Sequence, residues 1–295
     1  MYSPSGSDIF KVDVENVRDI APGVHVVSGS GNPLVPNIGI VAGDHSILMI
    51  DTGAGAGNGA RTSALLSRLS EGRRCILSFS HIHPEHYTGF PAFEGWSTIA
   101  CHADQIEEAM RFRSRSKGVV RSDILALVPD RPLSPEIVYN TSCHSLDLGG
   151  RTVLMNNWGT AHSRSDTTFH VLREGIIFMG DLIEEGSFPV FPWFPPDSIA
   201  VNGAEWMAVL RACLAERPRI VVPGHGQLGS DQLLQQYLDY MDGLAHEVSG
   251  ADLSDPRRAG AIQAKMEARY PCWVGREWIG PAVRHFMAAE ALSRG

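Results

Sequence analysis

Three histidines and a carboxylate lie within six residues, at positions 81–86, where the chain reads HIHPEH. They follow the apolar run 75–79, which is typical of a buried strand. In a turn that leaves a strand, His81 and His83 project to the same side, while Glu85 and His86 can face a second point nearby. Imidazole and carboxylate groups at this density can hold two metal ions a few ångströms apart, as in two-metal hydrolytic sites. The alternative is a solvated turn that is merely rich in histidine.

Further residues of the metal-ligand type follow, each beside glycine or another small residue. They are His162 in GTAHSRSD, Asp181 in FMGD and His225 in PGHG. Asp181 and His225 each come after an apolar run, and a side chain at a strand's end can reach a shared edge of the sheet without being buried in it. Singly, each could be a buried histidine bonded to backbone or an aspartate that caps a helix. Jointly, they favour one metal centre over a solvated turn.

The order of these segments resembles the metallo-β-lactamase superfamily. Its members have a strand ending in Asp, then a His-x-His-x-Asp-His turn, and then a His, an Asp and a His on successive loops. Here the strand ending in Asp is 47–51, and the similarity runs from about residue 20 to about residue 230. The resemblance implies an α/β fold, a four-layer αβ/βα sandwich with the metal site at one edge of its two sheets.

Carried over residue by residue, the resemblance also implies two metal sites that share Asp181. The first site would consist of His81, His83 and His162, and the second of Glu85, His86 and His225. The chain departs from the family at Glu85, where Asp is usual. Because Glu is one methylene longer, it could shift the second metal, weaken its binding, or leave Glu85 free to act as a base. We expect one or two Zn²⁺ ions per chain, with iron or manganese as alternatives for a carboxylate-rich site.

Asp51 has a different expected role, although it also ends a strand. A carboxylate at this place can orient a ligating histidine through the outer ring nitrogen, so we expect Asp51 to support the site and not to bind metal. The glycine-rich segment 53–59 follows it. This segment lacks Gly-Lys-Ser/Thr and the spacing of a dinucleotide-binding turn, so it predicts a plain loop from strand to helix.

The composition of the 295 residues is that of a globular enzyme, with 43% apolar and 20% charged residues. The net charge of −8 argues against nucleic acid as a partner, because phosphate backbones favour basic surfaces. The five cysteines are scattered without CxxC spacing, which suits reduced thiols in the cytoplasm. The chain shows neither a signal-peptide pattern nor an apolar run of membrane-spanning length, so we expect no membrane partner.

We expect residues 1–20 to form a flexible N-terminal segment, residues 20–250 the metallo-β-lactamase-like domain, and residues 251–295 a C-terminal helical extension packed on the same domain. Strands are predicted at 24–27, 38–41, 46–50 and 97–101, a hairpin over 167–180, and helices near 60–70, 103–116, 203–215 and 229–248, with two more within 255–292.

Two segments are expected to shape access to the site. Segment 118–142 contains three prolines, and we interpret it as a lid or pocket wall. The alternative is a surface excursion or an oligomer contact. Segment 188–196 is rich in proline and aromatic residues. It either lines an apolar substrate pocket or packs against a neighbouring subunit.

These features predict a metal-dependent hydrolase that uses metal-activated hydroxide on a small, rather apolar substrate with an ester, lactone, thioester or amide (lactam) bond. Asp181 would lie between the metals, and Glu85 could accept or return a proton. The partner would be a small molecule, and a homodimer is an open alternative to a monomer. Two other functions remain: an iron oxidoreductase of the persulfide dioxygenase type, and a weakly active metal-binding scaffold.

Overall fold

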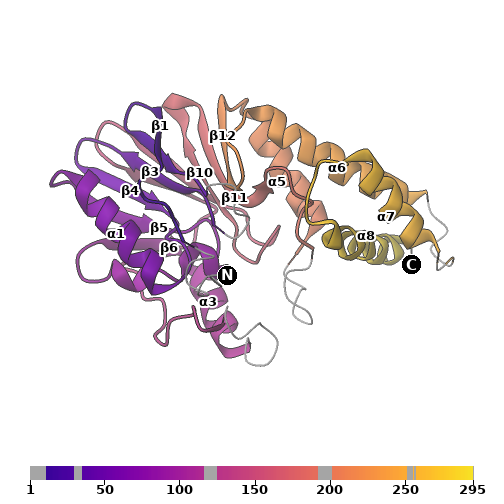
Figure 1. The fold of residues 1–295 in the computed structure, drawn as a ribbon, viewed down its shortest axis with the longest axis horizontal. Helices are drawn as coiled ribbons and strands as arrows, with labels where there is room; N and C mark the ends of the chain where they lie inside the picture. The colour runs from indigo at the N-terminus through magenta and orange to yellow at the C-terminus, as the bar shows by residue number, and fades with distance from the viewer. Residues whose placement is uncertain are drawn as a thin grey trace, which may run out of the picture.

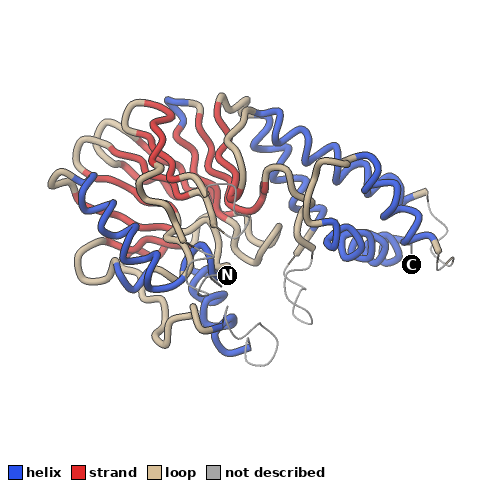
Figure 2. Tube along the Cα trace, in the orientation of Figure 1, coloured by secondary structure: helices blue, strands red, loops and turns tan. Residues whose placement is uncertain are grey.

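Two β-sheets pack face to face and carry helices on their outer faces (Figures 1 and 2). This is a computed structural model, and it describes residues 11–29, 35–115, 125–191, 201–250, 255 and 257–294. Within these residues, no helix combines the length and the apolar character needed to cross a membrane.

The first sheet has seven strands in chain order. They are β1 (Val17–Ala21), β2 (Val24–Val27), β3 (Ile38–Ala42), β4 (Ser46–Ile50), β5 (Arg74–Ser78), β6 (Thr98–His102) and β7 (Ile137–Tyr139). Strands β1 to β4 pair antiparallel, whereas β4 to β7 pair parallel. Parallel pairing brings the carboxyl ends of β4 and β5 to the same edge, so the residues that follow these strands emerge side by side.

The second sheet has five strands in the spatial order β12-β11-β10-β9-β8. They are β8 (Cys143–Asp147), β9 (Thr152–Asn157), β10 (Thr167–Val171), β11 (Ile176–Glu184) and β12 (Ile220–His225). The predicted hairpin is confirmed, since β10 and β11 pair antiparallel around the short 3-10 helix η2 (Leu172–Glu174). Strands β11 and β12 are parallel, so their carboxyl ends also meet at one edge.

The helices cover both outer faces. They are α1 (Gly55–Ser70), α2 (Pro84–Tyr87), α3 (Ala103–Arg115), α5 (Gly203–Ala215), α6 (Asp231–Ser249), α7 (Arg258–Arg269) and α8 (Ile279–Arg294), with the 3-10 helices η1 (Phe90–Ala92) and η4 (Arg276–Trp278). Helices α1 and α3 lie against the first sheet, and α5 and α6 lie against the second. The longer helices lie where the sequence predicted them, with one correction. Helix α1 begins at Gly55, so the loop predicted over 53–59 is wrong from residue 55 onward. The short helix α2 was not predicted.

Three apolar cores separate the four layers, as an αβ/βα sandwich requires. Strand β4 shows why its sequence is apolar from Ile47 to Ile50. Leu48 and Ile50 point into the core between the sheets, whereas Ile47 and Met49 point into the core beneath the helices. A strand buried on both faces cannot alternate polar with apolar residues. The predicted fold class is thus confirmed.

Both ends of the described part of the chain join this body. Val12 is buried, and its backbone N–H donates to Asn58 Oδ1 at 3.0 Å. Together with strand β1, this contact corrects the expectation of a flexible segment over 1–20, at least for residues 11–20; residues 1–10 lie outside the described part. At the other end, α7 and α8 pack with α6 and contribute to the helical core of the second sheet. Figure 1 shows these helices extending away from the sheets.

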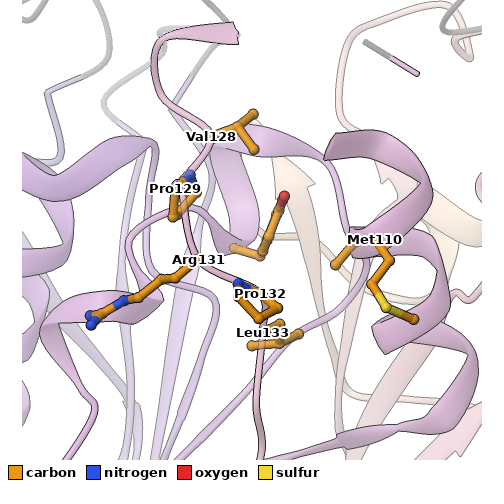
Figure 3. A pocket seen from close by; sticks show the side chains of 8 residues that line it. Met110, Val128, Pro129, Arg131, Pro132 and Leu133 are labelled. Carbon is orange, nitrogen blue, oxygen red and sulfur yellow. The ribbon is translucent and has the colours of Figure 1, made fainter. Parts of the chain in front are cut away.

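The described part of segment 118–142 lies against α3. Residues 128, 129 and 131–133 line a hollow of about 30 Å³ together with Tyr87, Ala109 and Met110 (Figure 3). That volume suffices for about one water molecule, so this hollow is not a substrate pocket. The expectation of a lid remains a prediction, because residues 118–124 lie outside the described residues.

Segment 188–196 differs from its expectation where the structure describes it. Phe188 and Phe191 are fully buried in the helical core. The Phe191 ring stacks on Trp206 with centroids 5.1 Å apart, and the Phe188 ring meets Tyr240 at 5.5 Å. These two aromatic rings therefore bind the second sheet to α5 and α6, and they line neither a pocket nor a subunit surface. Residues 192–196 lie outside the described part.

Candidate metal centre

Strand ends and turns from both sheets deliver the predicted ligands to one edge of the sandwich. His81 and His83 follow β5, and Glu85 and His86 lie in α2 directly after them. Asp181 lies near the end of β11, His225 ends β12, and His162 is carried by the loop between β9 and β10. All seven side chains are buried.

Their potential ligand atoms form two groups that share Asp181. In each group the atoms lie within 4.8 Å of one another; the first comprises His81, His83, His162 and Asp181, and the second comprises Glu85, His86, Asp181 and His225. These are the two sets that the sequence resemblance implied. The structure thus brings together every predicted ligand, while metal binding by each remains a prediction.

Asp181 lies between the groups and presents one carboxylate oxygen to each. Its Oδ2 is 3.6 Å from His81 Nε2 and 3.9 Å from His162 Nε2. Its Oδ1 is 3.2 Å from His86 Nε2 and 3.4 Å from His225 Nε2. A carboxylate with this arrangement can act as a bridge between two cations.

Glu85 belongs to the second group despite its extra methylene. The side chain is buried, and one carboxylate oxygen lies within reach of the ligand atoms of His86, Asp181 and His225. The first turn of α2 holds it there, with Pro84 as the first helical residue and His83 as the extended residue before it. Substitution of the usual Asp by Glu therefore leaves the oxygen in place as a potential ligand.

Asp51 supports the site as predicted. Its Oδ2 lies 2.8 Å from His86 Nδ1, and its Oδ1 accepts from Ser80 N at 2.7 Å. The Ser80 hydroxyl donates to Asp51 at 2.8 Å and lies 3.0 Å from His81 Nδ1. Asp51 adopts a φ of 69°, an uncommon conformation for a residue other than glycine. One carboxylate therefore helps to fix the ring orientation of ligands from both groups.

Two glycines leave room for the central carboxylate. A Cβ at Gly224 would lie 1.9 Å from Asp181 Oδ1, and a Cβ at Gly180 would lie 2.7 Å from Ser80 Cβ. Gly180 also has a φ of +54°. The small residues noted beside Asp181 and His225 in the sequence are therefore required by the close approach of β11, β12 and the turn after β5.

Asp166 stabilises the loop that carries His162 by accepting hydrogen bonds from the backbone of that loop. The Asp166 carboxylate accepts from the backbone N–H of Ser163 at 2.8 Å and of Ala161 at 3.2 Å. On the other side, the His162 ring meets Trp206 edge to face, with centroids 5.2 Å apart. Burial raises the pKa of Asp166 to about 7. In the sequence, Asp166 is the last residue of the motif GTAHSRSD that carries His162.

The pKa values divide the histidines between the two groups. Burial, aided by neighbouring imidazoles, lowers the pKa of His81 and of His83 well below the usual range, and lowers that of His162 to about 4. Burial acts the same way on His86 and His225. There, however, nearby carboxylates, chiefly Asp181, prevail and raise the pKa of both, His86 well above its ordinary value. Burial raises the pKa of Asp181, but the surrounding histidines outweigh it and bring the value well below normal.

Buried nitrogen and oxygen atoms without hydrogen-bond partners indicate that these residues are suited to hold a divalent cation. His81 Nε2, His86 Nε2 and Asp181 Oδ1 are buried and lack a hydrogen-bond partner. Buried polar atoms without partners are costly in free energy, and here they point at one another around two points. Imidazole nitrogens and carboxylate oxygens are donors suited to Zn²⁺ and to other first-row metals.

Glu184 is a functional candidate that the sequence did not reveal. It ends β11 opposite His225 on β12, and its side chain is buried. Burial and the nearby Asp181 raise the pKa of Glu184 to about 8. Its position at the end of an apolar strand, three residues after Asp181, was the available signal.

The chain belongs to the metallo-β-lactamase superfamily, whose sequence profile matches residues 31–225. The Acyl-coenzyme A thioesterase MBLAC2 of Gallus gallus is 26% identical over 235 residues, covering 72% of this chain and 81% of that protein. Membership and the metal-ligand groups support a hydrolase-like enzyme and imply a divalent metal.

Solved structures share the fold. A metallo-beta-lactamase family protein from Thermus thermophilus has a TM-score of 0.67 at 16% identity and covers 94% of this chain and 95% of its own. A beta-lactamase domain protein from Burkholderia ambifaria has a TM-score of 0.66 at 18% identity, with 94% and 88% covered. The metallo-beta-lactamase FIM-1 from Pseudomonas aeruginosa, solved in a mono-zinc form, has a TM-score of 0.57 at 18% identity and covers 77% of this chain and 94% of its own.

Proposed function

We propose that this protein is a zinc-dependent, two-metal hydrolase of acyl thioesters. The observation that carries the proposal is the position of Asp181, with one carboxylate oxygen facing each group of ligands. The thioesterase relative favours the thioester among the bonds that such a site can hydrolyse. The choice of zinc follows from the three imidazoles of the first group.

The reaction adds water across the C–S bond, giving a carboxylic acid and a thiol. A bound divalent ion supplies acidified water and polarises the carbonyl oxygen. Asp181 fixes the spacing of the two groups, and Asp51 holds the His86 ring in place through Nδ1. Burial raises the pKa of Glu85, which places its carboxyl closer to the range in which it can take a proton and return it to the departing sulfur.

The test begins with metal analysis of the purified protein. Samples stripped by chelation and reloaded with zinc, manganese or iron are then assayed for thiol release from acyl-CoA esters, beside chromogenic esters, lactones and β-lactams. We expect thiol release to disappear on stripping and to return with zinc. Full activity after complete stripping would contradict the proposal.

The same experiment addresses the other predicted functions. Stoichiometric iron together with oxygen consumption on a persulfide substrate would replace the hydrolase by an oxidoreductase. A metal-loaded protein that hydrolyses none of these substrates would favour the weakly active metal-binding scaffold. A matched pair of variants, Asp181→Asn and Asp44→Asn, distinguishes catalysis at the site from a contaminant, since Asp44 is exposed and lies outside both ligand groups.

A further inference from the structure

The N-terminus of α5 lies directly beside the loop that carries His162. The backbone N–H of Asn202, the residue before α5, donates to the carbonyl of Ala161 at 2.8 Å. One turn further on, the Trp206 ring meets the His162 ring with centroids 5.2 Å apart. The Trp206 Nε1–H also donates to the carbonyl of Leu182 in β11 at 3.0 Å. The first turn of α5 therefore helps to set the position of one ligand of the first group.

Two side chains from different elements cap this first turn. Asn202 Oδ1 accepts from the backbone N–H groups of Ala204 and Glu205, both at 3.2 Å. The N–H of Gly203 is left, and it donates to Nε2 of His285 in α8 at 3.1 Å. Because the first N–H groups of a helix have no partner within it, such acceptors hold the first turn in place. Helix α8 thus completes a cap that Asn202 completes only in part.

The surroundings of His285 suit it to accept this hydrogen bond. Its ring lies against Phe191, with centroids 5.3 Å apart, and against Phe286 at 5.6 Å. Burial lowers the pKa of the imidazole, so the ring is neutral at pH 7 and Nε2 keeps the lone pair that a backbone N–H requires. A Cβ at Gly203 would lie 2.7 Å from Phe286 Cζ. Helices α5 and α8 therefore meet here in close contact.

We propose that His285 is a positioning residue for the first group of metal ligands. By accepting from the Gly203 N–H, it fixes the turn of α5 on which the His162 loop rests. The C-terminal helical extension thereby contributes to the metal centre, although none of its described residues belongs to either ligand group. The inference rests on metal binding by the first group, as the proposed function does, but not on the substrate or the reaction.

The competing explanation is that His285 only fills space between the two helices. In that case an aromatic ring without nitrogen would serve equally well. His285→Phe keeps a ring against Phe191 and Phe286 and removes the acceptor, whereas His285→Gln removes the ring and keeps an acceptor oxygen. The two explanations therefore predict opposite orders of damage for these two variants.

The first measurement requires no substrate. Amide hydrogen exchange at Gly203 is followed by NMR in the full chain and in both variants, with and without zinc. We expect exchange to be about two- to tenfold faster in His285→Phe, the factor that one net hydrogen bond supplies, and His285→Gln to recover part of the protection. Equal protection of this amide in the parent and in His285→Phe would overturn the inference.

Zinc titration then tests the link to the metal centre. We expect His285→Phe to lower affinity for the first ion by about two- to tenfold, with the second ion unaffected and part of the loss recovered by His285→Gln. His246→Phe is the matched control, because His246 is exposed in α6 and lies outside both ligand groups. Greater damage by Gln than by Phe would leave His285 with a packing role alone. Loss of first-ion affinity in a protein that hydrolyses no thioester would uphold this inference and reject the proposed reaction.

Discussion

The two halves of the metal centre differ in how their charges are balanced. The first group consists of three imidazoles, all with a lowered pKa, beside one oxygen of Asp181. The second group contains two imidazoles with a raised pKa, Glu85, and the other oxygen of Asp181. The three imidazoles of the first group are thus neutral donors at pH 7, whereas in the second group the proton on His86 balances part of the carboxylate charge.

This difference has a consequence for metal binding. Ligands must be deprotonated to bind a metal, so an ion entering the first group displaces few protons, whereas an ion entering the second must displace the proton on His86. At neutral pH we expect the first group to fill before the second.

Asp181→Asn is expected to have the largest effect, because this carboxylate is the one residue common to both groups. The amide keeps the shape and removes the charge. We expect kcat/KM for thioester hydrolysis to fall by roughly a thousandfold or more, equivalent to ~4 kcal/mol of transition-state stabilisation. Loss of the second ion in metal analysis should accompany it. A variant that keeps two ions and a tenth of the activity would show that Asp181 does not bridge.

Substitution of one histidine in each group should show whether the two groups bind metal independently. His162→Ala is expected to abolish tight binding of the first ion, because it deletes one of three imidazoles. His225→Ala should leave the first ion bound and remove the second. Metal content at a fixed free zinc concentration checks both. Equal losses in the two variants would mean that the groups bind metal as one unit.

Asp51→Asn tests the support of the second group. Its carboxylate contacts His86 Nδ1 and accepts from Ser80, and both contacts favour one orientation of the His86 ring. Loss of such a partner usually costs ten- to a hundredfold in metal affinity or activity. We expect an effect in that range, measured as the zinc concentration for half-maximal activity, with Asp44→Asn unaffected. No change would assign Asp51 a folding role only.

The pH dependence of metal binding should also differ between the groups. The pKa values of His81, His83 and His162 lie below 6.5, so these rings are neutral from pH 6.5 to 8 and affinity for the first ion should change little there. The pKa of His86 lies well above 6.5, so affinity for the second ion should rise with pH, by about tenfold per unit for each proton displaced. Calorimetry in buffers of different ionisation enthalpy counts these protons. Equal proton release for both ions would contradict the division.

Sequence patterns predicted the fold and the ligand set because both depend on local features. Apolar runs followed by small and ligand-type residues mark strand ends at a sheet edge, and His225 is an instance. Asp181 follows the same pattern but lies three residues before the end of β11. Segment 188–196 was misjudged where it is described, since composition alone cannot show which apolar surface covers Phe188 and Phe191. Ser80 and Glu184 were missed for a related reason: their importance comes from contacts between strands that are distant in the chain.

Glu85→Asp is expected to have the smallest effect, and it tests the difference between the two ligand groups most directly. Aspartate at this position retracts the carboxylate by one methylene from a group in which the glutamate oxygen already reaches its neighbours. We expect affinity for the second ion to fall by a few-fold, affinity for the first to stay constant, and Glu85→Gln to weaken the second ion further because its charge is lost. Stronger binding of the second ion by the aspartate variant would show that Glu85 keeps that half of the centre weak. In that case its primary role would be proton transfer.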